Sequence, residues 1–348
     1  MTREEMLELL RELCLEFGPT GCEERVAELI KKKLGDREYK TDRLGNLIVR
    51  VPNEGAPKLM ISAHMDEVGF IINDITEDGY LKFTTLGGID PRVLCGKHVT
   101  VEGKDGLVPG VIASKAIHHQ TADERKKLTP IKSMYIDIGA KNKSDAEEMT
   151  GMAYSATFDS EFVVFGENKE FIKSKAIDDR LGCAVMLDVL GRLGENCPFD
   201  LYFCFTVREE IGLSGARTVA HAIDPDFCIV LESTAVGGLP GTPDSRRVAK
   251  LGGGCAISLR DNATIYDRDF VNFALDTARA KGVAAQVKKY VSGGNDAGSI
   301  HRSVDGVRSL AISVPSRYIH SPANVISTED YLSMSELVLA IIENGTEL

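Results

Sequence analysis

The sequence predicts an α/β protein: a mixed, largely parallel sheet covered by helices on both faces, with an inserted β-rich domain. First, short apolar runs typical of buried strands alternate along the chain with amphipathic helical patterns. Second, the sequence pattern changes between Val68 and about Phe165, where helical runs are few and alternating β segments are separated by Asp-Gly and Gly-Gly turns. We therefore expect a discontinuous α/β domain over residues 1–67 and 166–348 and an inserted domain over residues 68–165. The alternative is a β-meander that extends the main sheet.

Two helices are expected before the first buried strand. Thr2 and Glu5 form a capping-box pattern, the apolar residues that follow share one helical face, and Gly18 with the next proline ends the helix. The second helix runs from about Cys22 to Leu34, and the glycine after it is a typical C-cap.

Five apolar strands and three further helices are expected after these. The strands lie at residues 46–51, 58–64, 201–207, 227–233 and 309–314, and the helices at Arg180–Leu193, Gly212–Ile223 and Asp267–Lys281. Such apolar strands are typical of a parallel sheet that is buried on both faces.

The composition excludes several classes of protein. A net charge of -11 without a basic stripe argues against nucleic-acid binding. No run of about 18 uninterrupted apolar residues, the length that a membrane span needs, is present. We expect a cytoplasmic protein that binds neither nucleic acid nor membrane. Its 8 cysteines include no CxxC pair, so we expect small core residues rather than disulfides or a zinc ribbon.

Ionisable side chains gather at the predicted strand ends, where ligands bind in open α/β sheets. The candidates are His64, Asp66, Asp178, Asp179, Glu209, Glu210, Glu232 and His320. Each alone has an ordinary structural explanation, such as an acidic start to a helix. Together they favour a metal site, because burying so many carboxylates without compensation costs several kcal/mol each.

Two histidines and three carboxylates suit a pair of Zn²⁺ or Co²⁺ ions, which accept both ligand types. The predicted metal ligands are His64, Asp178, Glu210, Glu232 and His320. Three carboxylates and a bridging hydroxide balance the charge of two divalent ions.

Two residues close in sequence to predicted ligands, Glu209 and Asp66, have other predicted roles. Side chains of adjacent residues leave an extended chain in different directions, so Glu209 can face the bridging water if Glu210 binds metal. Glu209 would then act as the general base. Asp66 is placed to hold the His64 imidazole in the tautomer that coordinates metal. Glu67 is expected to be a solvated start to the insert.

These motifs carry a resemblance to a known family. His-x-Asp, Ala-x-Asp-Asp-Arg, Glu-Glu-x-Gly and a late His-Ser-Pro, in this order around a β-rich insertion, resemble the TET-type, glutamyl-aminopeptidase-like family of co-catalytic dizinc metallopeptidases. The resemblance implies that His64, Asp178 and Glu232 hold one metal. Asp178, Glu210 and His320 would hold the other, with Asp178 bridging.

The same resemblance implies an inserted PDZ-like domain that serves dimerisation, hollow tetrahedral dodecamers, and removal of N-terminal residues from short peptides. Some members of the family are described as endoglucanases. The sequence departs from the family at Glu232, where many relatives have Asp, and at Asn295, where Thr is common. His118-His119-Gln120 replaces a Pro-containing His motif, and we expect the adjacent histidines to lie at a surface or interface because neighbouring strand positions diverge.

The predicted function is therefore a metal-dependent aminopeptidase. A dimetal amidohydrolase or deacylase remains the main alternative, since the same ligands could serve it. Glycoside hydrolysis by two carboxylates would leave both histidines without a role. A non-catalytic assembly protein fits poorly with an intact ligand set and Glu209.

Overall fold

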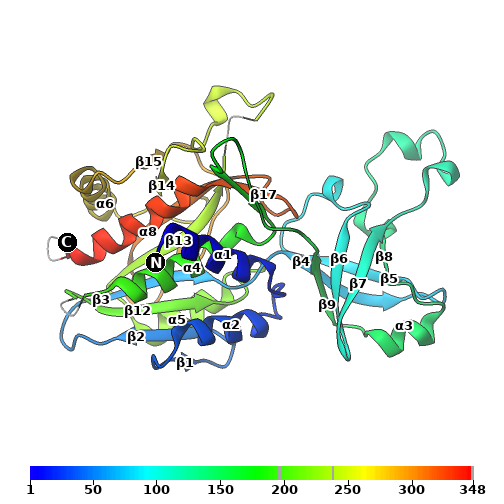
Figure 1. Ribbon diagram of the computed structural model, residues 1–348, viewed down its shortest axis with the longest axis horizontal. Coiled ribbons are helices and arrows are strands. Elements are labelled where there is room, and N and C mark those ends of the chain that lie inside the picture. Colours follow the sequence, from blue (N-terminus) through cyan, green and yellow to red (C-terminus); the bar gives the residue numbers. More distant parts are fainter. Residues whose placement is uncertain (195–196, 237–238, 346–348) are drawn as a thin grey trace.

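A computed structural model describes residues 1–194, 197–236 and 239–345 of the chain. It shows a mixed α/β domain and, beside it, a separate small β-barrel (Figure 1). The predicted fold class is confirmed. The separate barrel excludes the alternative of a meander that extends the main sheet.

The main sheet has a parallel centre and antiparallel edges. Its path is β1 (Lys40–Thr41), β2 (Leu47–Val51), β12 (Asp200–Thr206), β3 (Lys58–His64), β13 (Phe227–Ala235), β16 (Arg308–Arg317), β17 (Asn324–Ser327), β11 (Phe171–Ser174) and β10 (Val163–Phe165). β14 (Cys255–Ser258) and β15 (Ala285–Lys288) extend from β16. β3 lies between β12 and β13 and is parallel to both, so the carboxyl ends of these strands share one edge.

Helices cover both faces of this sheet. They are α1 (Arg3–Leu15), α2 (Glu24–Leu34), α4 (Ile177–Arg192), α5 (Ser214–Ile223), α6 (Arg268–Lys281), α7 (Ala297–Ile300) and α8 (Thr328–Glu343). On one face α4 packs against β3 and β13 and is covered by α1 and α8, while α5 and α7 pack against β12 and β13. One continuous apolar core joins these layers.

Local sequence signals explain how the helices begin. The predicted capping box of α1 is present, since Glu5 N–H donates to Thr2 Oγ1 (3.2 Å) and Thr2 N–H donates to Glu5 Oε2 (2.7 Å). The long helix α8 was not predicted, although Ser327 caps it by accepting from the N–H of Asp330.

The barrel is closed and has its own core. Its strands are β4 (Gly69–Ile75), β5 (Leu81–Leu86), β8 (Tyr135–Asp137), β7 (Gly106–Ala113), β6 (His98–Gly103) and β9 (Ser155–Phe158), with α3 (Lys143–Met149) beside them. Phe70 contacts Phe83 and Phe158 edge to face at its centre. Val163–Phe165, which lies inside the range predicted for the insert, pairs with β11 of the main sheet.

Other sequence expectations have mixed outcomes. All 8 cysteines are free, and 5 of them are buried, but Cys95 is exposed. His118 and His119 lie in a short 3-10 helix, Ile117–His119, rather than on a strand, and both are exposed. Among the described residues, no helix has both the length and the apolar character that crossing a membrane requires.

Candidate metal centre

The structure brings all five predicted ligands together at the carboxyl edge of the parallel strands. His64 ends β3, Glu210 lies in the loop after β12, Glu232 lies in β13, His320 follows β16, and Asp178 is in the first turn of α4. Side chains from five separate segments converge there because parallel strands end at a common edge.

The ligands form two groups that share Asp178. In one group, His64 Nε2 lies 3.6 Å from Asp178 Oδ1 and 4.0 Å from Glu232 Oε2. In the other, His320 Nε2 lies 3.2 Å from Asp178 Oδ2 and 3.3 Å from Glu210 Oε1. The two oxygens of Asp178 therefore face different histidines, which is the arrangement that a bridging carboxylate needs.

Both histidines present the same nitrogen to the carboxylates. His64 Nδ1 is 3.0 Å from the backbone carbonyl of Asp66, and His320 Nδ1 is 2.8 Å from the carbonyl of Gly88. A carbonyl oxygen can only accept, so each Nδ1 is a donor, and in the neutral ring the lone pair therefore lies on Nε2. Neutral imidazoles in this tautomer are metal ligands with their outer contacts already in place.

The carboxylates lack the donors that buried oxygens require. Asp178 Oδ1, Glu210 Oε1 and Glu232 Oε1 are buried without a hydrogen-bond partner. Burial raises the pKa of Glu210 to about 7 and the pKa of Glu232 well above its usual value. Unpaired buried acids are costly, and a cation relieves that cost by supplying the missing positive partner. The residues therefore fit a site for divalent metal.

The histidines respond to the same excess of negative charge. Burial opposes protonation of His320, but Asp178 and Glu210 outweigh this effect and raise its pKa to about 9. Burial also opposes protonation of His64, and its hydrogen bonds with Asp178 and Asp66 again raise the pKa. The carboxylates therefore favour positive charge between the two histidines, as a bound cation would supply.

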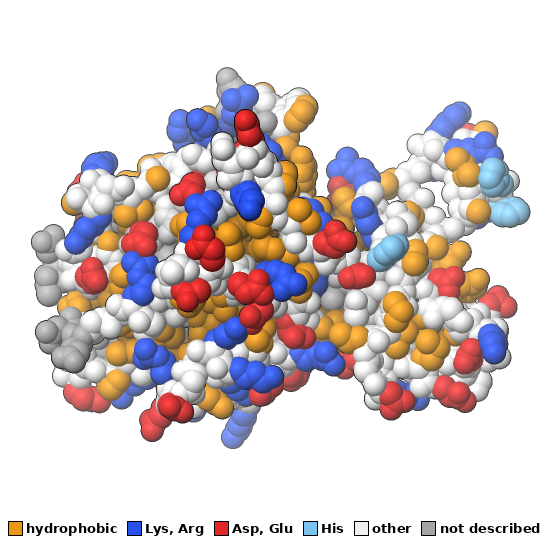
Figure 2. All heavy atoms as spheres, in the orientation of Figure 1, with side chains coloured by type: hydrophobic (Ala, Val, Ile, Leu, Met, Phe, Trp, Pro, Cys, Tyr) orange, Lys and Arg blue, Asp and Glu red, His pale blue; other side chains and the backbone are white. Residues whose placement is uncertain are grey.

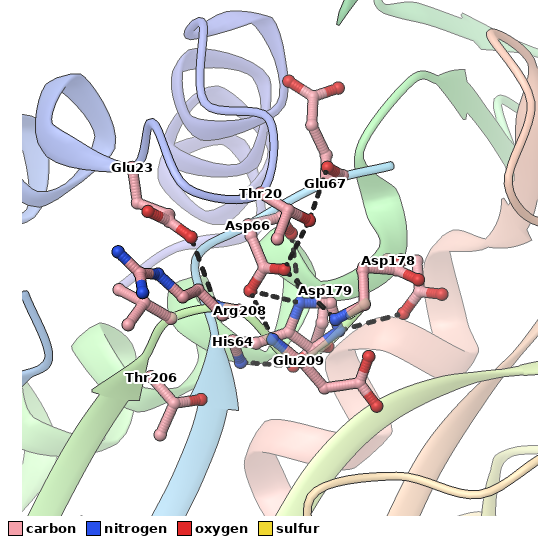
Figure 3. A network of polar contacts seen from close by, with 12 residues as sticks. Thr20, Glu23, His64, Asp66, Glu67, Asp178, Asp179, Thr206, Arg208 and Glu209 are labelled. Atoms are coloured by element: carbon pink, nitrogen blue, oxygen red, sulfur yellow. Dashed lines mark hydrogen bonds and ion pairs between the residues drawn. The ribbon is translucent and has the colours of Figure 1, made fainter. Parts of the chain in front are cut away.

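Asp66 holds more than the imidazole. Its carboxylate accepts from Thr20 Oγ1 (2.8 Å) and from the backbone N–H groups of Glu209 (3.0 Å) and Glu210 (3.2 Å) (Figure 3). Its Oδ1 is 3.5 Å from His64 Nδ1, farther than its own carbonyl oxygen. Asp66 thus fixes the loop that carries Glu209 and Glu210 as well as the ring of His64.

The loop after β12 turns through a conformation that bulky side chains seldom adopt. Arg208 has a φ of 59°, and its N–H donates to Glu23 Oε1 (3.2 Å). His320 has a φ of 58°. Backbone strain of this kind persists where surrounding contacts hold it and is common at functional sites.

Glu209 lines the cavity at the metal centre, and its side chain is not in the ligand group in which Glu210 contacts His320. The cavity has a volume of about 500 Å³ and includes Asp178, Glu210, Glu232 and His320 in its wall. Burial raises the pKa of Glu209 well above its usual value. One oxygen or nitrogen atom from each of His64, Glu209 and Glu210 also lies within 4.8 Å of the others, so Glu209 is close to both ligand groups.

The barrel contributes to the site, which the sequence did not indicate. Its loop at Gly87 and Gly88 lies against the second ligand group, and the Gly88 carbonyl orients His320. Gly87 has a φ of 81°, and a Cβ there would lie 3.1 Å from Glu210 Oε2 and 2.8 Å from a methyl group of Val68. Glycine is needed because the backbone approaches the ligands so closely.

Glu67 is not solvated, and that prediction was wrong. Its side chain is 2% exposed, and its Oε1 lies 2.5 Å from Lys175 Nζ and 3.5 Å from an Arg180 nitrogen. Lys175 also donates to the carbonyl of Glu16, and Arg180 donates to that of Leu13. Glu67 is buried beside two cations, one just before α4 and one in it, which together compensate its charge.

Two other motif residues are structural. Asp179 is buried, and its carboxylate accepts from the N–H groups of His64 (3.3 Å) and Gly182 (3.2 Å). Asn295 lines the cavity, where its amide nitrogen contacts Tyr266 Oη (3.1 Å) and its oxygen accepts from Ala297 N–H (2.9 Å). Neither is a metal ligand in this arrangement.

Comparison with known proteins agrees with this geometry. The M42 glutamyl aminopeptidase family matches residues 45–337. The chain belongs to the M42 family of aminopeptidases. As an M42 aminopeptidase it is a peptide hydrolase, and the resemblance stated from the sequence is confirmed.

Individual relatives cover nearly the whole chain. A putative aminopeptidase of Acetivibrio thermocellus is 34% identical over 98% of this chain and 100% of its own length. A TET aminopeptidase from a marine sediment archaeon of the Thaumarchaeota has a TM-score of 0.95 and 34% identity, over 98% of this chain and 96% of its own. The TET1 peptidase of Pyrococcus horikoshii, which can assemble into a tetrahedron or a large octahedral shell, has a TM-score of 0.87 and 34% identity over 97% and 99% of the two chains.

Proposed function

We propose that this M42 aminopeptidase removes N-terminal residues from short peptides with two divalent ions, Zn²⁺ or Co²⁺, and Glu209 as general base. His64, Asp178 and Glu232 would hold one ion, and Asp178, Glu210 and His320 the other. The observation that carries the proposal is the division of the two Asp178 oxygens between two histidine-carboxylate groups. Five side chains are too many for one tetrahedral site.

The residues of the chain have separate tasks in this scheme. When bound, divalent ions in such a site polarise a carbonyl and acidify water. Glu209 would accept a proton from the attacking water and deliver it to the nitrogen of the leaving amine. Asp66 would hold His64 and the backbone of Glu209 and Glu210 in place, so that base and ligands keep a fixed relation.

The cavity suits the N-terminal end of a peptide. Apart from the ligands and Glu209, its wall is neutral: Gly88, Leu213, Ser233, Thr234, Ala235, Ala263, Ser292, Gly293, Gly294, Asn295 and Ile319. A bound metal with the nearby carboxylates would receive the free α-amino group of such a peptide.

The test compares substrates with free and blocked N-termini. A panel of aminoacyl-anilides and their N-acetyl forms should be assayed with protein of measured metal content. We expect two ions per chain and cleavage of the free forms only. Cleavage of the acetylated forms at equal rates would favour the amidohydrolase or deacylase alternative, and no turnover by metal-loaded protein would favour a non-catalytic role.

We also propose that the chain self-associates into dimers and then into a tetrahedral dodecamer. The barrel carries none of the five ligands and stands apart from the main sheet, so it is free to pair with a second copy. The assembly described for the Pyrococcus horikoshii relative supports this end state. Size-exclusion chromatography with light scattering tests it, and a fully active monomer would contradict it. The cytoplasmic location stays a prediction.

A further inference from the structure

A second hollow begins at the metal centre and leads toward the barrel. We call it the exit groove, and its wall consists of Asp90, Arg92, Val93, Lys97, Ala235, Val236, Leu239, Ser316, Tyr318, Ile319, His320, Ser321, Pro322 and Ala323. Its volume is about 530 Å³. The space-filling view shows the surface indented between the α/β domain and the barrel (Figure 2).

The exit groove is continuous with the metal-centre cavity. Ala235, Ile319 and His320 line both hollows. The cavity holds the catalytic carboxylates, whereas the exit groove touches the ligand set only through His320. A peptide whose first residue occupies the cavity must pass its second and later residues out of it, and the exit groove offers that path.

Most of the exit groove is neutral, and its charges are unequal. Asp90 and Arg92 bind each other, with Arg92 Nε 2.8 Å from Asp90 Oδ2, so they largely cancel. Lys97 is exposed, and its ammonium group has no hydrogen-bond or ion-pair partner within the part of the chain that the structure describes. Lys97 is therefore the uncompensated positive charge of the exit groove, in a chain whose net charge is -11.

We infer that the exit groove binds the peptide segment that follows the scissile bond and that Lys97 binds the C-terminal carboxylate of a short peptide. This inference rests on the proposed function. A carboxylate is the group that would complement a free ammonium in the wall of a largely neutral groove. It would also explain preference for short peptides within a single chain, since only in these does the carboxylate come close to the cleaved bond.

The experiment compares peptide acids with their C-terminal amides. The N-terminal residue best accepted among the anilides is followed by one, two, three or four glycines, and each peptide is assayed as acid and as amide. We expect the acid to be cleaved with a kcat/KM about 2-fold to 5-fold higher at one peptide length, as suits an exposed charge contact. The preference should decline at high salt because screening weakens the contact.

Variants identify the residue responsible. Lys97→Met should abolish the acid preference, with kcat/KM for the acid falling to that of the amide, and Lys97→Arg should retain part of the preference. Lys132→Met is the matched control, because Lys132 is also an exposed barrel lysine and lines neither hollow.

The outcomes separate the two proposals. If free anilides are not cleaved, the proposed function fails. If anilides are cleaved but acids and amides react alike, or if Lys97→Met and Lys132→Met keep equal preference, the inference about the exit groove is overturned.

Discussion

Two clusters of charged side chains include residues at or just before the turn that follows β3. The Glu67 cluster consists of Glu67, Lys175 and Arg180, and in it two cations of the chain surround one carboxylate. The metal centre starts three residues earlier, at His64, and there carboxylate oxygens are left without donors. His320 in the metal centre is 29% exposed, whereas all three side chains of the Glu67 cluster are buried, and only the Glu67 cluster is compensated from within.

The difference indicates what each cluster is for. A buried carboxylate with cations of the chain beside it holds segments together, and here it joins the turn after β3 to the start of α4. Buried carboxylates that outnumber the available cations leave room for an ion. The metal centre should therefore depend on added metal, and the Glu67 cluster should not.

Removal of metal should separate the two clusters most clearly. Chelation should abolish hydrolysis, and Zn²⁺ or Co²⁺ should restore it, while the circular dichroism of the folded chain persists because the Glu67 cluster needs no ion. Metal analysis and activity should be measured on the same samples. Full hydrolysis in excess chelator, with metal confirmed absent, would contradict the two-metal mechanism.

Substitution of the adjacent glutamates tests which of them binds metal and which acts as the general base. Glu209→Gln should retain both ions and lower kcat by about 10²-fold to 10⁴-fold, the usual cost of a lost general acid-base group. Glu210→Gln should instead weaken metal binding, since its carboxylate lies in the second ligand group. The reverse pattern in metal titrations and kinetics would show that the two roles are exchanged.

Removal of the Glu67 carboxylate should affect stability rather than metal content. Glu67→Ala leaves Lys175 buried without its closest partner, and breaking a buried pair in this way costs about 3–5 kcal/mol. Denaturant titration should show that loss, with two ions still bound. Glu54→Ala is the control: Glu54 pairs with Arg50 at an exposed site and should change the midpoint little. Equal effects would mean that the Glu67 cluster is not a stabilising element.

A third buried carboxylate, that of Asp330, predicts a smaller, pH-dependent effect. It accepts from Gly252 N–H and Gly254 N–H, both at 2.7 Å, and burial still raises its pKa to about 6. The folded chain thus binds this proton more tightly than the unfolded chain. The resulting stability is complete below the usual pKa of 3.8 and is lost as pH rises through about 6.

The measurement is the free energy of unfolding at about pH 5 and pH 7, where one pKa unit corresponds to about 1.4 kcal/mol. The loss between these values should be smaller in Asp330→Asn than in the original chain. Identical losses in both proteins would show that Asp330 does not titrate in this range.

Much of the fold, and the convergence of the five proposed ligands at one edge of the sheet, could be predicted from the sequence. Apolar strands ending in His64 or preceding Glu210 have a strong local signal, and parallel strands place their ends together. The roles of Glu67 and Gly88 could not be read this way. Glu67 is buried by cations about 110 positions away in the chain, and Gly88 acts through its carbonyl, which no side-chain pattern reveals.

Edge elements were also missed for physical reasons. The short strands Cys255–Ser258 and Ala285–Lys288 obtain their structure from pairing with each other and with β16, not from a pattern of their own. The exposed histidines of Ile117–His119 lie in a 3-10 turn that sequence alternation does not distinguish from a strand.

The order of the ligands along the chain has a consequence for synthesis. His64 is made early, and the barrel from Gly69 to Phe158 is an uninterrupted segment that can fold while later residues are still being added. The centre of the main sheet cannot form at that stage, because β3 pairs with β12 and β13, which have not yet been made. Asp178 completes neither ligand group until Glu232 and His320 have been made. On the proposed scheme a nascent chain therefore has no peptidase activity for most of its translation. It cannot cleave neighbouring nascent polypeptides until the sheet has formed.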